Sequence, residues 1–352
     1  MTRNPGSDRS EPSPEHPSMT LTDKPHVLTA SRLPPLYLEP LQAAYTVHDR
    51  LHETDPAAFE RIAPLVQAVA ASGENQVAGE LMTRLPALKM VSVMGVGYDG
   101  VDVATARQRG IMVTHTPDVL NDEVADTAIG LMLCAARQLP AADRHVRAGL
   151  WPSGPLPLSR KMSGARLGIV GMGRIGKAIA HRAQAFSMQV AYTARTAKPE
   201  LPYAFHATPA ELAAHSDFLV VITPGGAGTR KLIDAHVLRA LGPQGILVNV
   251  ARGSVVDEAA LIEALQSGAL GGAALDVFEN EPRVPQALID MPHVVLAPHI
   301  GSATRETRQA MADLALNNLR LYFSGQPVLT PVAEMRASQL RSDEPVLPRE
   351  TP

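Results

Sequence analysis

Three polar side chains of different chemistry follow short apolar runs in the second half of the chain. Arg252 comes after ILVNVA, Glu281 after AALDVFEN and His299 after VVLAP. In an open α/β sheet, ligands bind outside the carboxyl ends of the strands. We therefore expect these three side chains to converge on one bound molecule. Taken singly, each could instead be a surface arginine, a solvated loop acid or a histidine in a packed turn.

These three residue types suit the reduction of a 2-oxo acid. Histidine can donate a proton to the carbonyl oxygen near neutral pH, and a neighbouring carboxylate stabilises its imidazolium form. An arginine can hold the substrate carboxylate and polarise the carbonyl group. A nicotinamide cofactor would supply the hydride. The sequence should therefore also contain a dinucleotide-binding motif.

A glycine-rich turn at residues 171–176 provides such a motif, G-x-G-x-x-G. A predicted strand at 167–170 precedes it, and a predicted helix at 177–186 follows. Glycines there allow a tight turn, the close approach of a pyrophosphate and close helix–strand packing, and the helix N-terminus faces the anion. A purely structural turn is the alternative. The predicted cofactor-binding residues of this turn are Gly171, Gly173, Arg174, Ile175 and Gly176.

The cofactor preference depends on the end of the second strand of this domain. NAD-binding domains usually carry an acidic residue there, for the ribose 2′-hydroxyl. This chain has Ala194, Arg195 and Thr196 instead. A guanidinium and a hydroxyl suit a 2′-phosphate, and no carboxylate repels it. We predict that NADPH is preferred over NADH; alternatively, Arg195 is a solvated loop residue and both cofactors are accepted.

The elements that must position these residues form two α/β units. Short apolar runs alternate with helical patterns from residue 26 and again from residue 166, which predicts two doubly wound parallel-sheet domains. We predict a flavodoxin-like substrate domain at 26–121 plus 303–331, because the helical segment 304–323 should return to it. A Rossmann nucleotide-binding domain is predicted at 122–302, with the active site in the cleft between the two domains.

Composition excludes several other classes of protein. A net charge of −3 without a local basic run argues against nucleic-acid binding. Cys134 is the single cysteine, and no H-E-x-x-H motif is present, so we predict no disulfide framework and no metal site. No apolar run is long enough to span a membrane.

The two ends of the chain are rich in proline and polar residues. We predict disordered tails at 1–25 and 332–352, and Met19 is an alternative start of the chain. The first residues lack the apolar core of a secretory signal, and together with the scarcity of cysteine this predicts a cytoplasmic location.

Several ordered motifs resemble those of the D-isomer-specific 2-hydroxyacid dehydrogenases, over about residues 26–330. The resemblance is greatest to the branch of glyoxylate/hydroxypyruvate reductases, which also includes hydroxyphenylpyruvate and 2-ketogluconate reductases. Besides the glycine-rich turn, the motifs are GVGYDGVD (95–102), VTHTPDVLNDEVADTAIGLML (113–133), NVARGSVVDEAAL (249–261), ALDVFENEP (274–282) and APHIGSAT (297–304).

The resemblance implies a role for each matching position. The family's catalytic residues fall on Arg252, Glu281 and His299, and the backbone N–H groups of Val96 and Gly97 would hold the substrate carboxylate. Arg252 and His299 would also contact the substrate. Of the remaining cofactor-binding positions, Thr223 and Val250 would line the cofactor groove, and Asp276 would lie near the nicotinamide and tune the site.

The resemblance also implies a homodimer built through the nucleotide-binding domain. Trp151 lies in the stretch from which an aromatic side chain reaches the partner's active site, or it simply packs in the dimer interface. Two positions depart from the family pattern: residues 224–227 read Pro-Gly-Gly-Ala where many members have Pro-Leu-Thr, and His115 replaces a common Asn. The first departure is expected to change contacts around the ribose.

Three functions are consistent with these features. The first is an NADPH-preferring reductase of small 2-oxo acids, such as glyoxylate and hydroxypyruvate, that produces D-2-hydroxy acids. The second is a reductase of larger aryl- or sugar-derived acids, such as hydroxyphenylpyruvate or 2-ketogluconate. The third is a catalytically inactive NAD(H)-binding regulator, against which the three intact catalytic positions argue.

Overall fold

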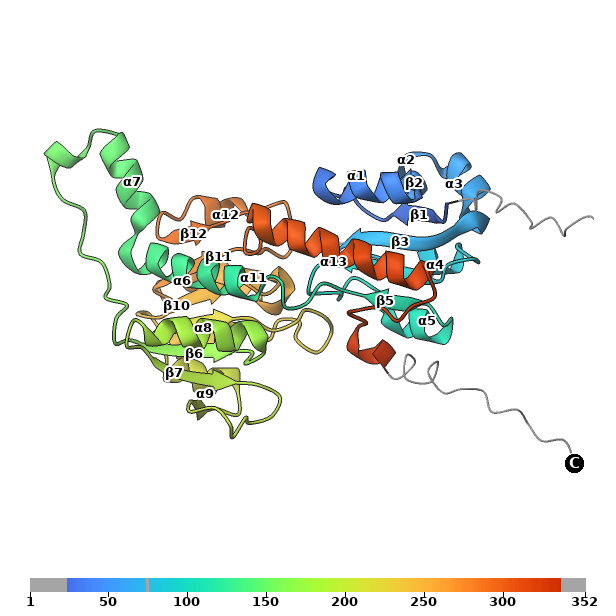
Figure 1. Ribbon diagram of the computed structural model, residues 1–352. Helices are drawn as coiled ribbons and strands as arrows, with labels where there is room; N and C mark the ends of the chain where they lie inside the picture. The colour runs from blue at the N-terminus through green and yellow to red at the C-terminus, as the bar shows by residue number, and fades with distance from the viewer. Residues whose placement is uncertain (1–23, 74–75, 337–352) are drawn as a thin grey trace, which may run out of the picture.

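The computed structural model describes residues 24–73 and 76–336, which form two parallel β-sheets flanked by helices (Figure 1). The first sheet has five strands in the order β2-β1-β3-β4-β5. Its strands are β1 (His26–Thr29), β2 (Thr46–Asp49), β3 (Val66–Ser72), β4 (Met90–Met94) and β5 (Met112–Thr114). Its helices are α1 (Pro35–Ala44), α2 (Leu51–Thr54), α3 (Pro56–Ile62), α4 (Gly79–Thr83) and α5 (Val103–Gln108).

The second sheet has seven parallel strands in the order β12-β11-β10-β9-β6-β7-β8. The chain order reverses between β6 and β9, which is the point where α/β sheets bind ligands. Its strands are β6 (Arg166–Val170), β7 (Gln189–Thr193), β8 (Ala204–Phe205), β9 (Phe218–Val221), β10 (Ile246–Asn249), β11 (Gly272–Leu275) and β12 (Val294–Leu296). Its helices are α8 (Arg174–Gln184), α9 (Pro209–Ala214), α10 (Ala235–Leu241), α11 (Glu258–Gln266) and α12 (Gln286–Ile289).

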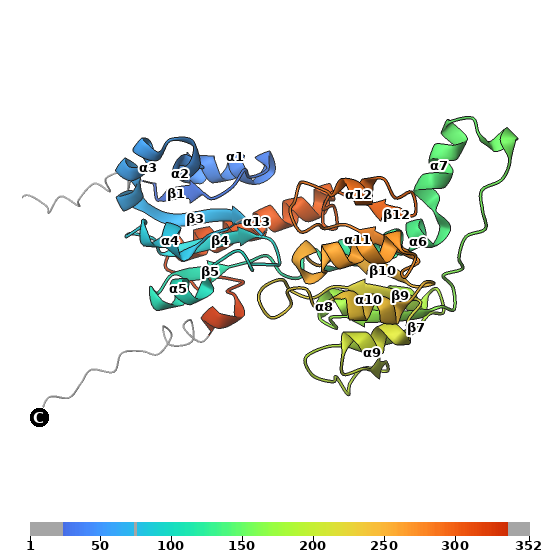
Figure 2. The ribbon, with the colours of Figure 1, turned by 180° about the vertical axis from the view of Figure 1, so that it is seen from behind.

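Burial explains why these runs form strands. All residues of β9, β10 and β11 are buried, as expected of parallel strands that helices cover on both faces. Helices α6 and α8 lie over one face of the second sheet, and α10 and α11 lie over the other (Figures 1 and 2). The apolar runs predicted from residue 166 onward form six of these strands, β6, β7, β9, β10, β11 and β12. The seventh strand, β8, consists of two exposed residues, so no apolar run marks it.

Three further helices connect the two sheets. Helix α6 (Asn121–Arg137) packs on α8, β10 and β11, and α7 (Leu139–Arg147) extends away from the body of the protein (Figure 1). Helix α13 (Arg305–Phe323) packs on α1 and β4. Ser92 of β4 donates a hydrogen bond to the carbonyl oxygen of Ala315, at 3.2 Å. The chain after residue 304 therefore lies against the first sheet.

The ordered chain extends further toward the C-terminus than predicted. Residues 1–23 and 337–352 of the predicted tails lie outside the described residues, and so does Met19. Residues 332–336 do not belong to a disordered tail, because Val332 and Met335 are buried in the core of the first sheet. Their apolar side chains stabilise a short 3-10 turn, Ala333–Met335. Within the described part of the chain, no helix has the length and apolar character needed to cross a membrane.

Candidate active site

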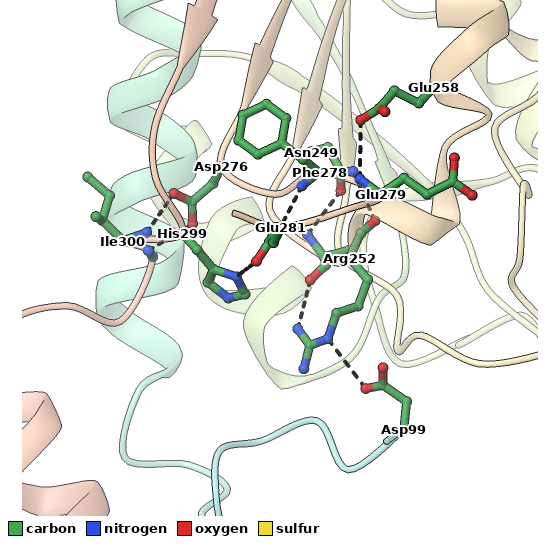
Figure 3. A network of polar contacts seen from close by, with 12 residues as sticks. Asp99, Asn249, Arg252, Glu258, Asp276, Phe278, Glu279, Glu281, His299 and Ile300 are labelled. Atoms are coloured by element: carbon green, nitrogen blue, oxygen red, sulfur yellow. Dashed lines mark hydrogen bonds and ion pairs between the residues drawn. The ribbon is translucent and has the colours of Figure 1, made fainter. Parts of the chain in front are cut away.

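A histidine and a glutamate form the centre of the site, at the carboxyl edge of the second sheet (Figure 3). His299 Nδ1 lies 2.8 Å from Glu281 Oε2. The other carboxylate oxygen, Oε1, accepts a hydrogen bond from the backbone N–H of Phe278, also at 2.8 Å. Both carboxylate oxygens are therefore engaged, which fixes the orientation of the imidazole ring. Each side chain keeps about a quarter of its surface exposed, 23% for His299 and 25% for Glu281.

The electrostatics of this pair favour an ionised carboxylate. Burial by itself would raise the pKa of Glu281, but the hydrogen bonds from His299 and from the N–H of Phe278 lower it. The charges of His299 and Arg252 lower it further. The net result is a pKa below the ordinary value of a glutamate. Figure 3 shows the Arg252 side chain beside this pair, so the structure brings the three predicted catalytic side chains together.

A turn directly after β10 positions Arg252. The side chain of Asn249 accepts a hydrogen bond from the N–H of Ala251 and donates one to the carbonyl oxygen of Arg252, at 3.1 and 3.0 Å. Asn249 is 1% exposed, so this clamp is protected from water. The guanidinium Nη1 donates to the carbonyl oxygen of Ala251 at 2.8 Å.

The first domain contributes the loop that faces Arg252. Val96 and Gly97 follow β4 and are partly buried. The guanidinium packs directly on Gly97, where a Cβ would overlap Arg252 Nη2. Asp99, from the same loop, lies 3.4 Å from Arg252 Nε (Figure 3). Residues from both sheets therefore meet at Arg252.

Asp276 is buried and supports the backbone around His299. Its two carboxylate oxygens accept hydrogen bonds from the N–H groups of Ile300 and Gly301, at 2.7 and 2.8 Å. Its backbone oxygen accepts from the N–H of His299, at 2.8 Å. Burial raises the pKa of Asp276, against the lowering effect of the two N–H donors. Asp276 thus binds the backbone at His299 through its own backbone oxygen and directly after His299 through its carboxylate, and His299 has a left-handed backbone conformation with φ +53°.

The glycine-rich turn has the geometry that a dinucleotide requires. Gly171 has φ +108°, in the region that favours glycine. A Cβ at Gly176 would overlap the carbonyl oxygen of Gly171, so α8 can begin this close to β6 only with glycine there. A Cβ at Gly173 would meet no described atom within 4 Å, which leaves space for a pyrophosphate beside the N-terminus of α8. The residues present therefore fit the cofactor that the motif implies.

Other predicted cofactor residues lie around this turn. Thr223 follows β9, and its Oγ1 is buried without a hydrogen-bond partner among the described residues. A buried hydroxyl of this kind is suited to a ligand. Val250, 7% exposed, follows β10. Ile175 is partly buried at the start of α8, and Arg174 Nε pairs with Asp118 Oδ1 at 3.0 Å.

The predicted 2′-phosphate residues follow β7 at the surface. Ala194 is partly buried, whereas Arg195 and Thr196 are exposed. Both polar side chains can therefore reach a ligand that lies along this edge of the sheet.

Sequence reasoning missed the residues that hold the predicted ones in place. Asp99 and Asn249 contact Arg252, and Glu258 accepts a hydrogen bond from the N–H of Glu279 at 3.1 Å (Figure 3). Asp99 and Asn249 both lie in the motifs quoted above, so their place beside predicted site residues was the available signal. Glu258 also lies in a quoted motif, but the sequence does not indicate that it binds the backbone N–H of Glu279.

Comparison with known proteins identifies the family. The family described as D-isomer specific 2-hydroxyacid dehydrogenase, NAD binding domain, matches residues 129–301. A glyoxylate/hydroxypyruvate reductase A of Arabidopsis thaliana is 49% identical over 267 residues, which cover 76% of this chain and 85% of the relative. A hydroxyphenylpyruvate reductase of Plectranthus scutellarioides is 48% identical over 282 residues, which cover 79% of this chain and 90% of the relative.

A solved structure agrees with these relatives. The NADPH-dependent glyoxylate/hydroxypyruvate reductase of Sinorhizobium meliloti, in complex with NADP and malonate, superimposes with a TM-score of 0.84. It is 47% identical, and the match covers 89% of this chain and 98% of that one. The chain therefore belongs to the D-isomer-specific 2-hydroxyacid dehydrogenase family. It is an oxidoreductase that uses a nicotinamide cofactor.

Proposed function

We propose that this enzyme is an NADPH-preferring reductase of small 2-oxo acids, glyoxylate and hydroxypyruvate among them, and that it produces D-2-hydroxy acids. The observation that carries the proposal is the 2.8 Å contact between His299 and Glu281 beside Arg252. The names of the similar proteins support the substrate class. We assign cofactor binding to residues 122–302 and substrate binding to residues 26–121 and 303–331, with the substrate between them.

The substrate carboxylate binds where the two domains meet. The N–H groups of Val96 and Gly97 donate to it, and the guanidinium of Arg252 supplies the opposite charge. Arg252 also lies close enough to polarise the carbonyl group as negative charge develops on its oxygen. This anchoring orients the 2-oxo acid for reaction on one face, which determines the D configuration of the product.

The proton comes from His299. Its Nδ1 faces Glu281, so we assign Nε2 as the nitrogen that donates to the carbonyl oxygen. Glu281 stabilises the imidazolium before the transfer and keeps the ring in place afterwards. When bound, the reduced nicotinamide supplies the hydride that the carbonyl carbon receives.

The preference for NADPH rests on Arg195 and Thr196. Both are exposed at the end of β7, and neither is an acid that would repel a 2′-phosphate. The similar Sinorhizobium meliloti reductase is named as NADPH-dependent, which supports the same preference here.

A substrate and cofactor panel tests this proposal. Initial rates are measured with glyoxylate, hydroxypyruvate, pyruvate, 4-hydroxyphenylpyruvate and 2-ketogluconate, each with NADPH and with NADH. We expect the highest kcat/KM for glyoxylate or hydroxypyruvate with NADPH. Arg195→Ala should raise KM for NADPH by about tenfold, because a charge-assisted hydrogen bond is lost, and should leave KM for NADH within about twofold. Arg239→Ala, at an exposed arginine of α10, is the matched control.

Other outcomes decide against the proposal. A higher kcat/KM for 4-hydroxyphenylpyruvate or 2-ketogluconate would support the reductase of larger acids. No turnover with any 2-oxo acid, together with intact cofactor binding, would support the inactive regulator. Equal effects of Arg195→Ala on both cofactors would refute the role of Arg195 in cofactor choice.

We also propose that the enzyme acts as a homodimer in the cytoplasm. Helix α7 and the segment that follows it carry apolar side chains in water, among them Val146, Leu150, Trp151 and Leu158. Exposed apolar surface of this extent is typical of an interface. A second copy of the chain is its proposed partner, and Trp151 either packs in that interface or reaches the partner's active site.

A further inference from the structure

His115, the residue that departs from the family's Asn, is held firmly behind the active site. It follows β5 and is 8% exposed. Its backbone N–H donates to the carbonyl oxygen of Thr330 at 3.1 Å, and its own carbonyl oxygen accepts from Thr330 Oγ1 at 2.6 Å. The backbone of His115 is therefore fixed on both sides by the C-terminal segment, and its ring can act as a rigid support.

The ring of His115 makes one directed polar contact. Nδ1 lies 2.9 Å from the carbonyl oxygen of Val96. Because a carbonyl oxygen only accepts, the hydrogen must be on Nδ1. Burial lowers the pKa of His115, which favours the neutral ring, and Nδ1 remains the donor in either charge state. The ring of Tyr98 meets it edge to face, with centroids 5.2 Å apart.

This contact determines the direction of a different group, the N–H of Gly97. The carbonyl of Val96 and the N–H of Gly97 belong to the same planar peptide unit, and in a trans peptide they point in opposite directions. The preceding peptide is held in the same way, because the carbonyl oxygen of Gly95 accepts from the N–H of Thr116 at 2.8 Å. Two successive hydrogen bonds on one side of the loop thus direct the N–H groups of Val96 and Gly97 to the other side.

We propose that His115 is a positioning residue for substrate binding: through Val96 it directs the N–H of Gly97 toward the substrate carboxylate. The inference rests on the proposed function, in which that N–H binds the carboxylate. It also accounts for the Asn that is common at this position. The amide nitrogen of Asn and the Nδ1 of His are both bonded to Cγ, so an Asn can donate to the same carbonyl oxygen.

Three substitutions of His115 test this role. His115→Asn keeps a donor on Cγ, His115→Gln moves the donor one bond further out, and His115→Leu removes it. We expect the Leu and Gln variants to raise KM for the preferred 2-oxo acid by about tenfold, the effect of one weakened charge-assisted hydrogen bond. The inhibition constant of malonate, a dicarboxylate that cannot be reduced, should rise in parallel.

The same variants should change little else. We expect kcat and the dissociation constant of NADPH, measured by its fluorescence, to stay within about twofold of wild type. His115→Asn should restore KM to near the wild-type value. Intact NADPH binding shows that a variant is folded, so a rise in KM cannot then be attributed to unfolding.

Three results would overturn the inference. An unchanged KM in the Leu variant would show that the contact with Val96 does not matter. Equal damage from Asn and Leu, or loss of NADPH binding in parallel with the rise in KM, would mean that His115 acts only through packing. A wild-type enzyme that reduces no 2-oxo acid would instead refute the proposed function, and this inference with it.

Discussion

At the level of single residues, Glu281 contributes a negative charge to the site and also fixes the orientation of the His299 ring. Its carboxylate is bound by His299 and by a backbone N–H, and these contacts with the nearby positive charges lower its pKa despite burial. A carboxyl with a lowered pKa stays ionised throughout the neutral range. In that range it favours the protonated form of the neighbouring imidazole.

Replacement of Glu281 by Gln should therefore change the pH dependence of reduction. The amide carries no charge to stabilise the imidazolium, so His299 should lose its proton at a lower pH. We expect the alkaline limb of the kcat/KM profile to move to lower pH by about one unit and the maximum rate to fall by about 10²-fold. The measurement is the rate of NADPH oxidation between pH 5.5 and 9.5. An unshifted alkaline limb would contradict the assigned role.

At the residue level, position after a strand predicted which side chains lie near one another. Arg252, Glu281 and His299 each follow a strand of the second sheet, and the structure places the three side chains close together, while their catalytic roles stay predictions. The contacts of Asp99 and His115 could not be predicted in this way. Their partners lie on other segments of the chain, and only packing shows that Asp99 faces Arg252 and that His115 supports Val96.

At the level of elements, the contact between β6 and α8 determines whether a cofactor can bind. The helix begins at Arg174, directly after the glycine turn, and Gly176 lies against the carbonyl oxygen of Gly171. Any side chain at residue 176 must push the helix away from the strand. The N–H groups at the start of α8 would then no longer lie where a pyrophosphate could accept from them.

Gly176→Ala should consequently weaken cofactor binding. We expect the dissociation constant of NADPH to rise by about tenfold or more, because close helix–strand packing at the third glycine is lost. Gly130→Ala is a matched control: Gly130 is also helical, in α6, but a Cβ there meets no described atom within 4 Å. This second change should leave NADPH binding unaltered and should stabilise the fold by up to about 1 kcal/mol. Similar binding losses in both variants would contradict the packing argument.

At the level of the whole molecule, the arm, which consists of α7 and the segment that follows it, packs least against the rest of its own chain. It extends away from the second sheet (Figure 2), and Leu158, on the segment that leads from α7 back to β6, is 101% exposed. Helix α7 itself has no buried residue. Contacts within its own chain stabilise such an arm only weakly. We therefore propose that a second copy of the chain covers it.

A charge on the arm should separate the subunits. We expect wild type to elute as a dimer and Leu158→Glu to shift toward monomer in size-exclusion chromatography with light scattering, because a buried unpaired carboxylate is costly. Leu65→Glu is the control, since Leu65 is an exposed leucine of the first domain, at 51%. A monomeric wild type, or equal effects of both changes, would contradict the proposed interface.

The family, the two parallel sheets and the proximity of Arg252, Glu281 and His299 could all be inferred from the sequence. Each depends on local patterns: apolar runs of strand length, glycines at fixed spacing, and polar residues just after a strand. The short edge strand β8 escaped prediction because its two exposed residues form no such pattern. The order at residues 332–336 escaped because two isolated apolar side chains, Val332 and Met335, are recognisable only by the core they enter.

The arrangement of the supporting contacts emerged only from the folded chain. A hydrogen bond such as that from His115 to Val96 depends on the distance between two segments and on the plane of one peptide. Neither quantity is encoded in residue types or spacing, because both result from how the strands, the α13 segment and the C-terminal turn pack together. Local patterns specify which groups are present, and long-range packing specifies where each of them points.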